Sequence, residues 1–595
     1  MWDLRRLSYL FISFLGLSMS AFDLYSQELE PEVICGILGL SSVEEAGEEE
    51  IMKLEHYLAH PLPINRCSFS NLQRSGLFSP YQAANIVDYI SRTGDILSLY
   101  ELSMVDGFNQ NLSRFYSMFL DFSSDDISSN NYSSHKLHLR GGLKSGRESK
   151  DFRYDLGLKY SAEIANKLSI RTGFNWPESQ AKTWPLDASF HLTWHMRNLD
   201  LSIGDINFRF AQGLALWTGL SFSSLPSYSL FMKNPRGLGM PDSYTGGSCM
   251  TGLGLQINSG RWVFTTALAL KGLREGRLDL VPVFNASWYG RKLRLGHTAT
   301  VLVDFRGGQP LLRALSSIDI ASCLKGTDIF AEFAVDWTSF TLAGLVGFRQ
   351  PLGDYFRMAM STRYYPSGFK ELSSGAQCSI SKVSNEVGGN LAIEFKSKTH
   401  QVDLGTDFAW HPDKLGSIIK DDWQERVVLD YILSKTPWIF AMKYSFKLRG
   451  NFTHSAQESR YASFAPRHEC RIDLRHEKQV WNIGLRTHFQ YSKAFSFLTF
   501  IEGAYKQKRF KLYLRQGFFW ADNWEDRIYT YERDLPQSFS LPAHYGRGLW
   551  TSGYASFDLG SGIRIIVKAS YEAWPWNVRK KSGRAGLKIF SSFSF

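Results

Sequence analysis

The sequence contains no long uninterrupted apolar segment. After residue 26, no stretch is long and apolar enough to form a transmembrane helix, which needs about 20 predominantly apolar residues. If the mature chain lies in a membrane, it must do so as a closed β-barrel, because only helices and closed barrels satisfy every backbone polar group in lipid.

Cysteine is also scarce, with six residues in a chain of 595 and no CxxC pair or dense spacing. This scatter indicates neither a zinc site nor a disulfide scaffold. A bridge between Cys35 and Cys67 stays open for an oxidising compartment. The remaining cysteines are Cys249, Cys323, Cys378 and Cys470.

Catalytic signatures are missing as well. The sequence has no GxSxG elbow, no HExxH, no Walker loop and no GxGxxG after a strand. His191 and His195 fall on one face of a predicted strand, but their separation of about 13 Å is too long for one metal ion. We therefore predict no enzymatic activity, no metal site and no cofactor. A His with a Ser or Asp neighbour on an adjacent strand stays open, because the sequence does not give the strand register.

Residues 1–26 have the pattern of a secretory signal. Arg5 and Arg6 supply positive charge, Leu7 to Phe22 form an apolar core, and Leu24-Tyr25-Ser26 offers a cleavage site. The apolar run is too short and too interrupted by serine to span a bilayer comfortably. We expect this segment to direct export.

Residues 27–121 are predicted to form a small helical domain. The segment Ser42-Val43-Glu44-Glu45 can act as a capping box, and the helix after it ends at Pro61. Two short units with one layout follow, each with a turn and a helix. The turns are Ser75–Phe78 and Asp106–Asn109, followed by helices that begin at Pro80 and carry Leu112 and Phe115, respectively.

This layout resembles the tandem helix-hairpin-helix domain of bacterial competence DNA receptors over roughly sixty residues. The resemblance rests on Pro63-Ile64-Asn65, on the link from Tyr89 to Leu102 and on the two turns. It implies that turn N–H groups and a helix N-terminus hold a DNA phosphate. The candidate residues for contact with a phosphate or a protein partner are Arg74, Gly76, Leu77, Phe78, Gly107, Phe108, Asn109 and Arg114.

Two features distinguish this region from that family. The second glycine of each hairpin is replaced by Phe78 and Asn109, and Phe adopts a left-handed backbone only with strain. Residues 27–121 also carry a net charge of about −9, whereas non-specific DNA binding is mostly phosphate neutralisation by Lys and Arg. The fold is therefore expected to serve protein docking or structure, with double-stranded DNA binding as the alternative.

Beyond a polar linker at 122–133, helical periodicity disappears. Alternating apolar and polar residues recur in some twenty or more segments. The clearest segments are Phe152–Ala162, Ala188–Arg197, Ile206–Trp217, Phe510–Trp520 and Ile563–Tyr571. A soluble propeller or sandwich also alternates. A membrane barrel is favoured by turns of unequal length, by Trp574 and Trp576 near a strand end, and by the lack of a blade-length repeat.

The last nine residues strengthen the prediction of a barrel. Leu587, Ile589, Phe593 and Phe595 fall on one face of a strand that ends on an aromatic residue. This resembles the closing-strand signature that the outer-membrane assembly machinery reads, although Ser591 replaces one apolar residue. We expect roughly 18–24 strands over residues 134–595 and a lumen too wide for its own side chains to fill.

Residues Gly204–Gly219 and Ser227–Thr245 resemble a stretch of a Bacteroidota-type outer-membrane family that joins a helix-hairpin-helix domain to a large barrel. This resemblance implies an inward-folded loop that carries Lys233 and Arg236. An ordinary external loop is the alternative. The positive charge of the barrel region favours anionic solutes, lipopolysaccharide or nucleic acid, or simply belongs to a solvated lumen wall.

The sequence thus predicts an α plus all-β chain: a signal at 1–26, a periplasmic helical domain at 27–121, a linker and a large antiparallel transmembrane β-barrel at 134–595. We expect a non-catalytic outer-membrane protein for transport, export or envelope docking. DNA uptake and a purely structural role are the alternatives. The expected partners are outer-membrane lipid and lipopolysaccharide, the assembly machinery, a periplasmic protein and, in the alternative, double-stranded DNA.

Overall fold

The structure is a computed structural model of the 595-residue chain. Before residue 60 it describes only Val33, Ile34, Ile37, Leu54, Tyr57 and Leu58. Beyond that it describes residues 61–67, 69–75, 77–78, 80–108, 110–124, 133–145, 152–164, 167–177, 187–196, 198–219, 228, 231–241, 249–273, 276, 278–290, 292–305, 310–324, 326–380, 382–412, 422–454, 460–464, 466–536, 538, 540–560, 562–576 and 583–595. The predicted signal, the capping box at 42–45, Gly76, Asn109 and most of the predicted linker lie outside these residues.

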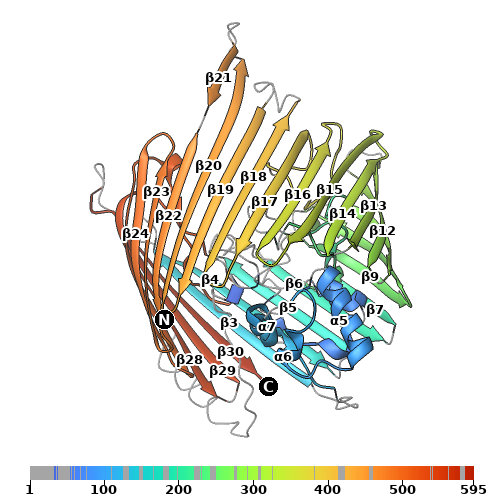
Figure 1. Ribbon diagram of the computed structural model, residues 1–595, viewed down its shortest axis with the longest axis horizontal. Helices are drawn as coiled ribbons and strands as arrows, with labels where there is room; N and C mark the ends of the chain where they lie inside the picture. Colours follow the sequence, from blue (N-terminus) through green and yellow to red (C-terminus); the bar gives the residue numbers. More distant parts are fainter. Residues whose placement is uncertain are drawn as a thin grey trace.

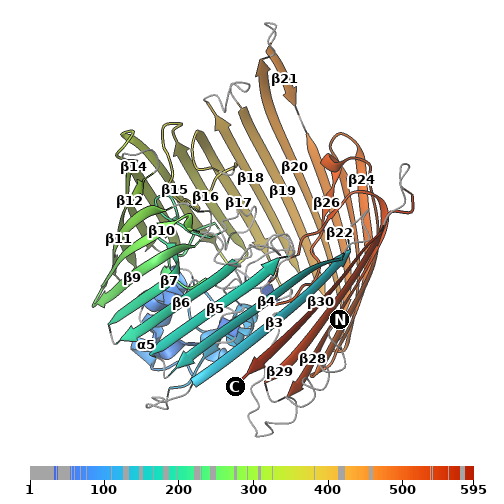
Figure 2. The same cartoon turned by 180° about the vertical axis from the view of Figure 1, so that it is seen from behind.

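Alternating residues from Ser133 onward form a closed antiparallel barrel of 24 strands, the upper end of the predicted range (Figures 1 and 2). The propeller and sandwich alternatives are therefore wrong. The barrel strands are β3 (Ser133–Ser145), β4 (Phe152–Ile164), β5 (Leu168–Pro177), β6 (Asp187–Met196), β7 (Leu199–Arg209), β9 (Met250–Ser259), β10 (Trp262–Lys271), β11 (Asp279–Tyr289), β12 (Leu293–Asp304), β13 (Leu311–Leu324), β14 (Thr327–Asp336), β15 (Thr341–Leu352), β16 (Phe356–Tyr365), β17 (Glu386–Lys396), β18 (His400–His411), β19 (Asp422–Lys435), β20 (Trp438–His454), β22 (Arg467–Glu477), β23 (Trp481–Tyr491), β24 (Phe495–Lys506), β25 (Phe510–Ala521), β28 (Gly546–Gly560), β29 (Ile563–Ala573) and β30 (Gly583–Ser594).

The barrel closes where its first strand pairs with its last. β3 and β30 run antiparallel, with Lys136 opposite Ser594 and Lys144 opposite Gly586. Past the end of β30, the backbone N–H of His135 donates to the carbonyl of Phe595 (2.8 Å) and the N–H of Phe595 donates to that of His135 (3.0 Å). The two rings also stack, with centroids 5.5 Å apart. Closure leaves no unpaired edge, as a barrel in lipid requires.

The two faces of the wall have opposite polarity. Along β4, Tyr154, Leu156 and Leu158 are exposed on the outside, whereas Lys159 is buried on the lumen side. The same alternation holds in β6, where Phe190 and Trp194 face outward and His191 faces the lumen. An exposed apolar outer surface over a polar interior is the pattern of a membrane-spanning barrel, not of a soluble β-protein.

The two ends of the barrel differ in the length of their connections. At one end, successive strands are joined by two or three residues, and both β3 and β30 have their outer termini there. We call this the short-turn end. The opposite, long-loop end carries every long connection, including those after β7, β16 and β25. β21 (Arg460–Phe464) pairs antiparallel with the last residues of β20 at the long-loop end.

A group of helices precedes the barrel. Its helices are α4 (Phe69–Arg74), α5 (Pro80–Thr93), α6 (Leu99–Leu102), α7 (Gln110–Tyr116), η2 (Ile64–Arg66) and η3 (Ser117–Phe119). β1 (Leu62–Pro63) and β2 (Leu120–Asp121) pair in parallel and bring the two ends of the group together. Within the part of the chain that the structure describes, no helix combines the length and the apolarity needed to cross a bilayer.

Local sequence accounts for these helices. Pro80 opens α5, where its missing N–H costs no hydrogen bond, and Ala83 and Ile86 bury one face three residues apart. Ser98 caps α6 by accepting from the N–H of Glu101 (3.3 Å), and Glu101 accepts in return from the N–H of Leu97 (2.6 Å). This pair is a variant of the capping box, in which Glu101 binds the N–H of the residue before the N-cap.

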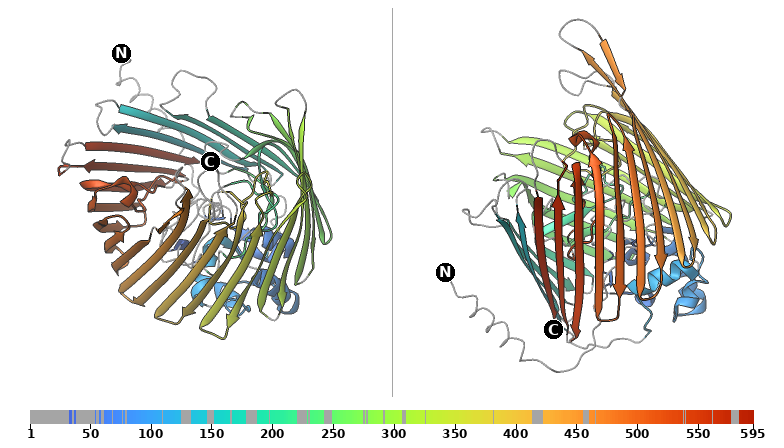
Figure 3. Two further views of the ribbon diagram at one scale, coloured as in Figure 1. Left: turned by 90° about the horizontal axis from the view of Figure 1, so that it is seen from above. Right: turned by 90° about the vertical axis from the view of Figure 1, so that its left-hand side faces the viewer.

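Seen from above, the helices lie within the barrel outline, and they are at its short-turn end (Figure 3, left). α5 contacts β13 and β14, and the ring of Phe69 is 6.5 Å from that of Tyr289, which ends β11 on the lumen side. The side chain of Tyr531, from the far side of the barrel, packs against the apolar core of the helices. The helical group therefore fills part of the lumen.

Candidate functional site in the barrel lumen

Three connections from the long-loop end also lie inside the lumen. We call them inward segments A (residues 210–219, 228 and 231–241, after β7), B (residues 366–380 and 382–385, after β16) and C (residues 522–536, 538 and 540–545, after β25). Segment A includes β8 (Gly237–Gly239), which pairs with the end of β7. Segment C includes η7 (Trp524–Asp526) and the short strands β26 (Ile528–Tyr529) and β27 (Ala543–His544). These segments and the helices together are the candidate functional site.

Segment A begins with a chain reversal. The sequence predicts one strand over 206–217, but β7 ends at Arg209, so that prediction is wrong beyond this residue. Ala211 and Gly213 have φ values of +53° and +85°, and the N–H of Thr218 then donates back to the carbonyl of Phe208 (2.8 Å). A Cβ at Gly213 would lie 3.2 Å from the backbone of Gly375, so both its conformation and its packing favour glycine.

This reversal is fastened to the wall by one buried carboxylate. Glu332 of β14 is fully buried. Its Oε2 accepts from the backbone N–H groups of Gln212 and Leu214, both at 2.9 Å, and its Oε1 accepts from that of Ala215 at 3.1 Å. Left-handed residues between right-handed ones make such concave sets of N–H groups, which suit an anion. Glu332 is therefore the main polar anchor of segment A.

Segments A and B are joined to each other. The carbonyl of Gly213 accepts from the N–H of Gly375 (2.9 Å) and from the hydroxyl of Ser374 (2.7 Å). The N–H of Trp217 donates to the carbonyl of Ser373 (2.9 Å). Because of these bonds, segment B cannot keep its position if segment A leaves.

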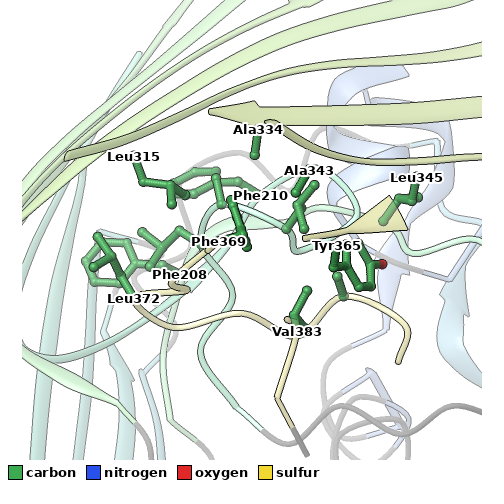
Figure 4. Packing of buried hydrophobic residues seen from close by; sticks show 14 of the residues in the cluster. Phe208, Phe210, Leu315, Ala334, Ala343, Leu345, Tyr365, Phe369, Leu372 and Val383 are labelled. Atoms are coloured by element: carbon green, nitrogen blue, oxygen red, sulfur yellow. The ribbon is translucent and has the colours of Figure 1, made fainter. Parts of the chain in front are cut away.

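Apolar packing supports the same arrangement. Figure 4 shows Phe208 and Phe210 beside Phe369, Leu372 and the side chains of the wall. The cluster is buried and includes Leu214, Leu216, Phe231 and Met232 from segment A and Leu372, Ala376 and Val383 from segment B. Each fully buried large apolar side chain contributes roughly 1.5–3 kcal/mol. The lumen on the β9–β19 side is thus packed like a protein core.

Lys233 and Arg236, the residues predicted for an inward loop, both lie on segment A. The ammonium group of Lys233 donates to the carbonyl of Gly375 and lies 4.4 Å from the centre of the Trp217 ring. The backbone N–H of Arg236 donates to the carbonyl of Arg209 (3.0 Å). Lys271 of β10 holds segment B in a similar way, through the carbonyl of Leu372.

Segment C lies against the opposite wall. Lys568 pairs with Glu532 (2.8 Å) and Lys588 with Asp534 (2.5 Å). Leu535 is buried among Tyr513, Tyr554, Ile566 and Phe590 of the wall. Trp574, predicted near a strand end, directly follows β29; it is buried and donates to the carbonyl of Tyr545 (2.8 Å), whereas Trp576 is exposed.

The helices meet the inward segments near the short-turn end. The amide of Asn234 in segment A donates to the carbonyl of Phe78 (3.4 Å). Tyr228 of segment A lies 5.6 Å from the guanidinium groups of both Arg349 and Arg357 on the wall. The side chain of Tyr531 connects segment C to the helices by packing against their apolar core. Segments that enter from both ends of the barrel therefore contact one another inside it.

The predicted hairpin residues lie in two different environments. Leu77 and Phe78 are buried, and Phe78 stacks on Tyr116 with ring centroids 5.3 Å apart. Gly107 is exposed, with a φ of +93°, and its carbonyl accepts from the side chain of Gln82 (3.1 Å). Phe108 is half-buried and Arg114 is exposed, whereas the side chain of Arg74 lies outside the described residues.

Tyr116 secures the first hairpin from within. Its hydroxyl donates to the carbonyl of Leu77 (2.8 Å). Burial raises the pKa of Tyr116 above its usual value, which the charge of Arg349 only partly offsets. The first hairpin is thus occupied by contacts within the protein.

The strand register brings a serine, a histidine and an aspartate side chain, those of Ser169, His195 and Asp200, within hydrogen-bonding distance of one another in that order. The hydroxyl of Ser169 lies 3.0 Å from Nε2 of His195, whose Nδ1 lies 2.8 Å from Asp200. The hydroxyl of Ser169, however, is buried and donates to Glu163 (2.5 Å), so its proton is committed to a carboxylate. A nucleophilic serine instead gives its proton to the histidine. His191 binds the carbonyl of Asp205 (2.6 Å).

Among the residues described above, no group of three or more His, Cys, Asp and Glu side chains is arranged to hold a metal ion.

The closing-strand residues lie on β30 and just beyond it. Leu587, Ile589 and Phe595 are exposed on the outer face, and Phe593 is half-buried. That an outer-membrane assembly machinery recognises these residues stays a prediction.

Sequence reasoning missed the residues that hold the inward segments. Glu332, Glu532 and Asp534 stand in ordinary strand or loop sequence, and only the register shows which groups they face. In segment B, the thiol of Cys378 donates to the carbonyl of Ile380 (2.7 Å), and burial raises its pKa to about 12. Burial likewise raises the pKa of Glu371, which accepts from the N–H of Val383 (3.2 Å).

Neither a family model nor a curated protein matches this chain. Among solved structures, the barrel is similar to the siderophore receptor PirA from Pseudomonas aeruginosa, with 9% identity over 78% of this chain and 81% of that chain and a TM-score of 0.41. The P pilus usher PapC translocation pore gives 9% identity, 78% and 99% coverage and a TM-score of 0.37. The outer membrane protein opdK from Pseudomonas aeruginosa has 9% identity over 78% of this chain and 99% of that chain, with a TM-score of 0.28. At these TM-scores the likenesses carry no conclusion about this chain.

Proposed function

We propose that the protein is a non-catalytic, gated outer-membrane conduit for transport or export. The observation that carries the proposal is a barrel of 24 strands whose lumen is occupied by the chain's own helices and inward segments. A barrel of this size encloses far more space than its wall side chains fill. A purely structural protein has no need of a wide barrel that it must then fill with dedicated segments.

The orientation follows from the connections. In outer-membrane barrels the short turns face the periplasm and the long loops face outward. The helices would then lie at the periplasmic mouth, where a partner could move them. Segments A, B and C would enter from the outer side. Opening needs both layers to shift, since Asn234 and Tyr531 join the inward segments to the helices.

A docking role for the helices is supported by their surface. Tyr100 in α6, Leu97 before it and Met104 after it are 73%, 61% and 77% exposed, although all three are apolar or aromatic. They form a patch with acidic residues Asp95, Glu101 and Asp106 beside them in the sequence. A periplasmic protein with an apolar contact and a basic rim would match this patch.

A role of the helices in DNA uptake is less well supported. The family's mechanism requires hairpin N–H groups that are open to a phosphate. Here Phe78 is a core residue, and the second hairpin is fixed to α5 through its carbonyls, by Gln82 at Gly107 and by Asn85 at Asp106 (3.0 Å). Only Arg114 remains as an exposed candidate cation among the predicted residues that the structure describes.

The conduit is tested by ion conductance in planar bilayers. The wild-type protein should be mostly closed, and Glu332→Ala should open large, long-lived channels because segment A loses its anchor. Glu525→Gln removes an exposed carboxylate that pairs with Lys493 at the same end, and should stay closed like the wild type. A variant Glu332→Ala that inserts into the bilayer but never conducts would remove the support for a conduit.

A further inference from the structure

The lumen wall carries opposite charge on its two sides. The inward faces of β29, β30, β3, β4 and β5, consecutive around the barrel, are here called the seam wall. These strands contain ten basic and three acidic residues. The basic residues are Arg564, Lys568, Arg584, Lys588, Lys136, Arg140, Lys144, Arg153, Lys159 and Arg171, and the acidic ones are Glu572, Asp155 and Glu163.

The opposite wall is acidic. The five strands β14–β18 contain four basic and seven acidic residues. Segments A and B pack on that side, where the buried cluster includes wall residues from Phe330 to Val428. The seam wall faces segment C instead of segments A and B. Its surplus of positive charge therefore borders the part of the lumen that is less densely filled.

A cavity of about 550 Å³ lies between the seam wall and segment C. Its basic lining comes from β3, β29 and β30, through Lys144, Lys568, Arg584 and Lys588. Glu572 in the same wall is already engaged, by Arg584 (2.5 Å) and by His544 of segment C (3.1 Å). The volume suffices for a small solute, since ligand pockets begin near 300 Å³.

Segment C supplies carboxylates to this wall. Lys568 lies 2.8 Å from Glu532 and 3.6 Å from Asp534, and Lys588 lies 2.5 Å from Asp534. The hydroxyl of Ser538 is 3.4 Å from the guanidinium of Arg140. The attraction in a buried ion pair gains little over the cost of desolvating its two charges. Such pairs therefore stabilise segment C only weakly, and another anion can replace the carboxylates of Glu532 and Asp534 on the wall cations.

We infer that the seam wall is an anion-binding path through the lumen, and that Glu532 and Asp534 occupy it in the closed state as resident anions. The permeant solute is then one that bears carboxylate or phosphate groups. This inference rests on the proposed conduit function and names the class of its solute.

The test is the ion selectivity of the full-length protein in planar bilayers under a tenfold KCl gradient. The double variant Glu532→Gln/Asp534→Asn removes both resident anions and should conduct. Its permeability should favour Cl⁻ over K⁺ by roughly sevenfold, since a potential of about one kT along the path changes the two ion concentrations e-fold in opposite directions. Adding Lys568→Gln/Lys588→Gln should lower this ratio toward one. Millimolar inorganic pyrophosphate should reduce the chloride current of the double variant.

Asp473→Asn is the matched control, because Asp473 also pairs with a wall cation, Arg471 at 3.0 Å, but lies on β22, outside the cavity and the inward segments. It should leave the protein closed. Heat-modifiable migration in gels shows that each variant is a folded barrel. Selectivity is also measured in Glu332→Ala, which opens by a different route.

The outcomes separate the two proposals. If both Glu332→Ala and the double variant insert as folded barrels and neither conducts, the conduit itself is wrong. If Glu332→Ala conducts and the double variant stays closed, Glu532 and Asp534 are not the resident anions. If the channels conduct with a Cl⁻ to K⁺ ratio near or below one, the seam wall is not an anion path.

Discussion

Replacing Glu332 should loosen the inward segments without disturbing the barrel. The side chain lies on the lumen face of β14, and its backbone bonds to β13 and β15 do not depend on its identity. Glu332→Ala leaves the N–H groups of Gln212, Leu214 and Ala215 without their acceptor. Each such buried, unpaired group costs about 1–3 kcal/mol. Even the lower bound, about 3 kcal/mol for three groups, raises the open fraction of segment A by roughly 100-fold.

Cys378 provides the assay. Its thiol, with a pKa of about 12 caused chiefly by burial, has almost no thiolate at neutral pH, whereas a solvated thiol near pKa 8.5 has a few per cent. Maleimide should therefore label Cys378 only when segment B opens. Since segment B is bonded to segment A at Gly213 and Trp217, labelling should follow the opening of A. Mass spectrometry distinguishes Cys378 from the other cysteines.

The expected order of labelling rate is wild type, then Glu332→Gln, then Glu332→Ala, with the last about 100-fold above the first. Glutamine keeps one acceptor oxygen but loses the negative charge, so we expect the labelling rate of Glu332→Gln to lie between those of the wild type and Glu332→Ala. Glu525→Gln should match the wild type. If Glu332→Ala labels at the wild-type rate, the carboxylate does not hold segment A, and the reasoning from its three hydrogen bonds is refuted.

Three further predictions concern segment C, the helices and closure. Burial would raise the pKa of Asp534, but Lys568 and Lys588 more than offset this and lower it, so the contribution of Asp534 is present above pH 3.8, its ordinary value, and is lost as the pH falls further; conductance should rise on acidification below about pH 4, and a protein that stays closed there contradicts this. Phe78→Ala should destabilise the helices by about 3–5 kcal/mol, seen as faster proteolysis at 61–124, whereas the exposed Met104→Ala should change stability by less than about 0.5 kcal/mol. Deleting Phe595 removes both backbone hydrogen bonds to His135, so the fraction of the protein that migrates in gels as a folded, heat-modifiable barrel should fall in membranes. An unchanged fraction would show that barrel closure does not depend on this residue.

The sequence predicts the barrel well because its pattern is local. Alternation at Phe152–Ala162 follows from the two-residue period of a strand with one side in lipid, and no distant contact is needed to see it. The helix at Pro80 and the reversal at Gly107 are likewise set by proline and glycine preferences.

The contents of the lumen depend instead on pairs far apart in the chain. Glu332 faces N–H groups more than a hundred residues earlier, and Lys588 faces Asp534 across a loop and two strands. Residues 206–217 alternate like a strand, but the tertiary contacts of Gly213 turn them inward. Trp574 is of a residue type that is common in the aromatic girdles of membrane barrels, but its tertiary contacts bury it in the lumen. Such contacts are fixed only once the strand register is known.

The central claim, that the helices occupy the lumen of the membrane-embedded barrel, is tested most directly by cross-linking. Phe69 lies against Tyr289 on the inner wall, with ring centroids 6.5 Å apart. A Phe69→Cys/Tyr289→Cys variant in otherwise cysteine-free, intact outer membranes should form an intramolecular bond with a short bis-maleimide and migrate faster after denaturation. If each cysteine reacts with a monofunctional maleimide but the pair never cross-links, the helices lie outside the lumen and the account of a self-closed conduit is contradicted.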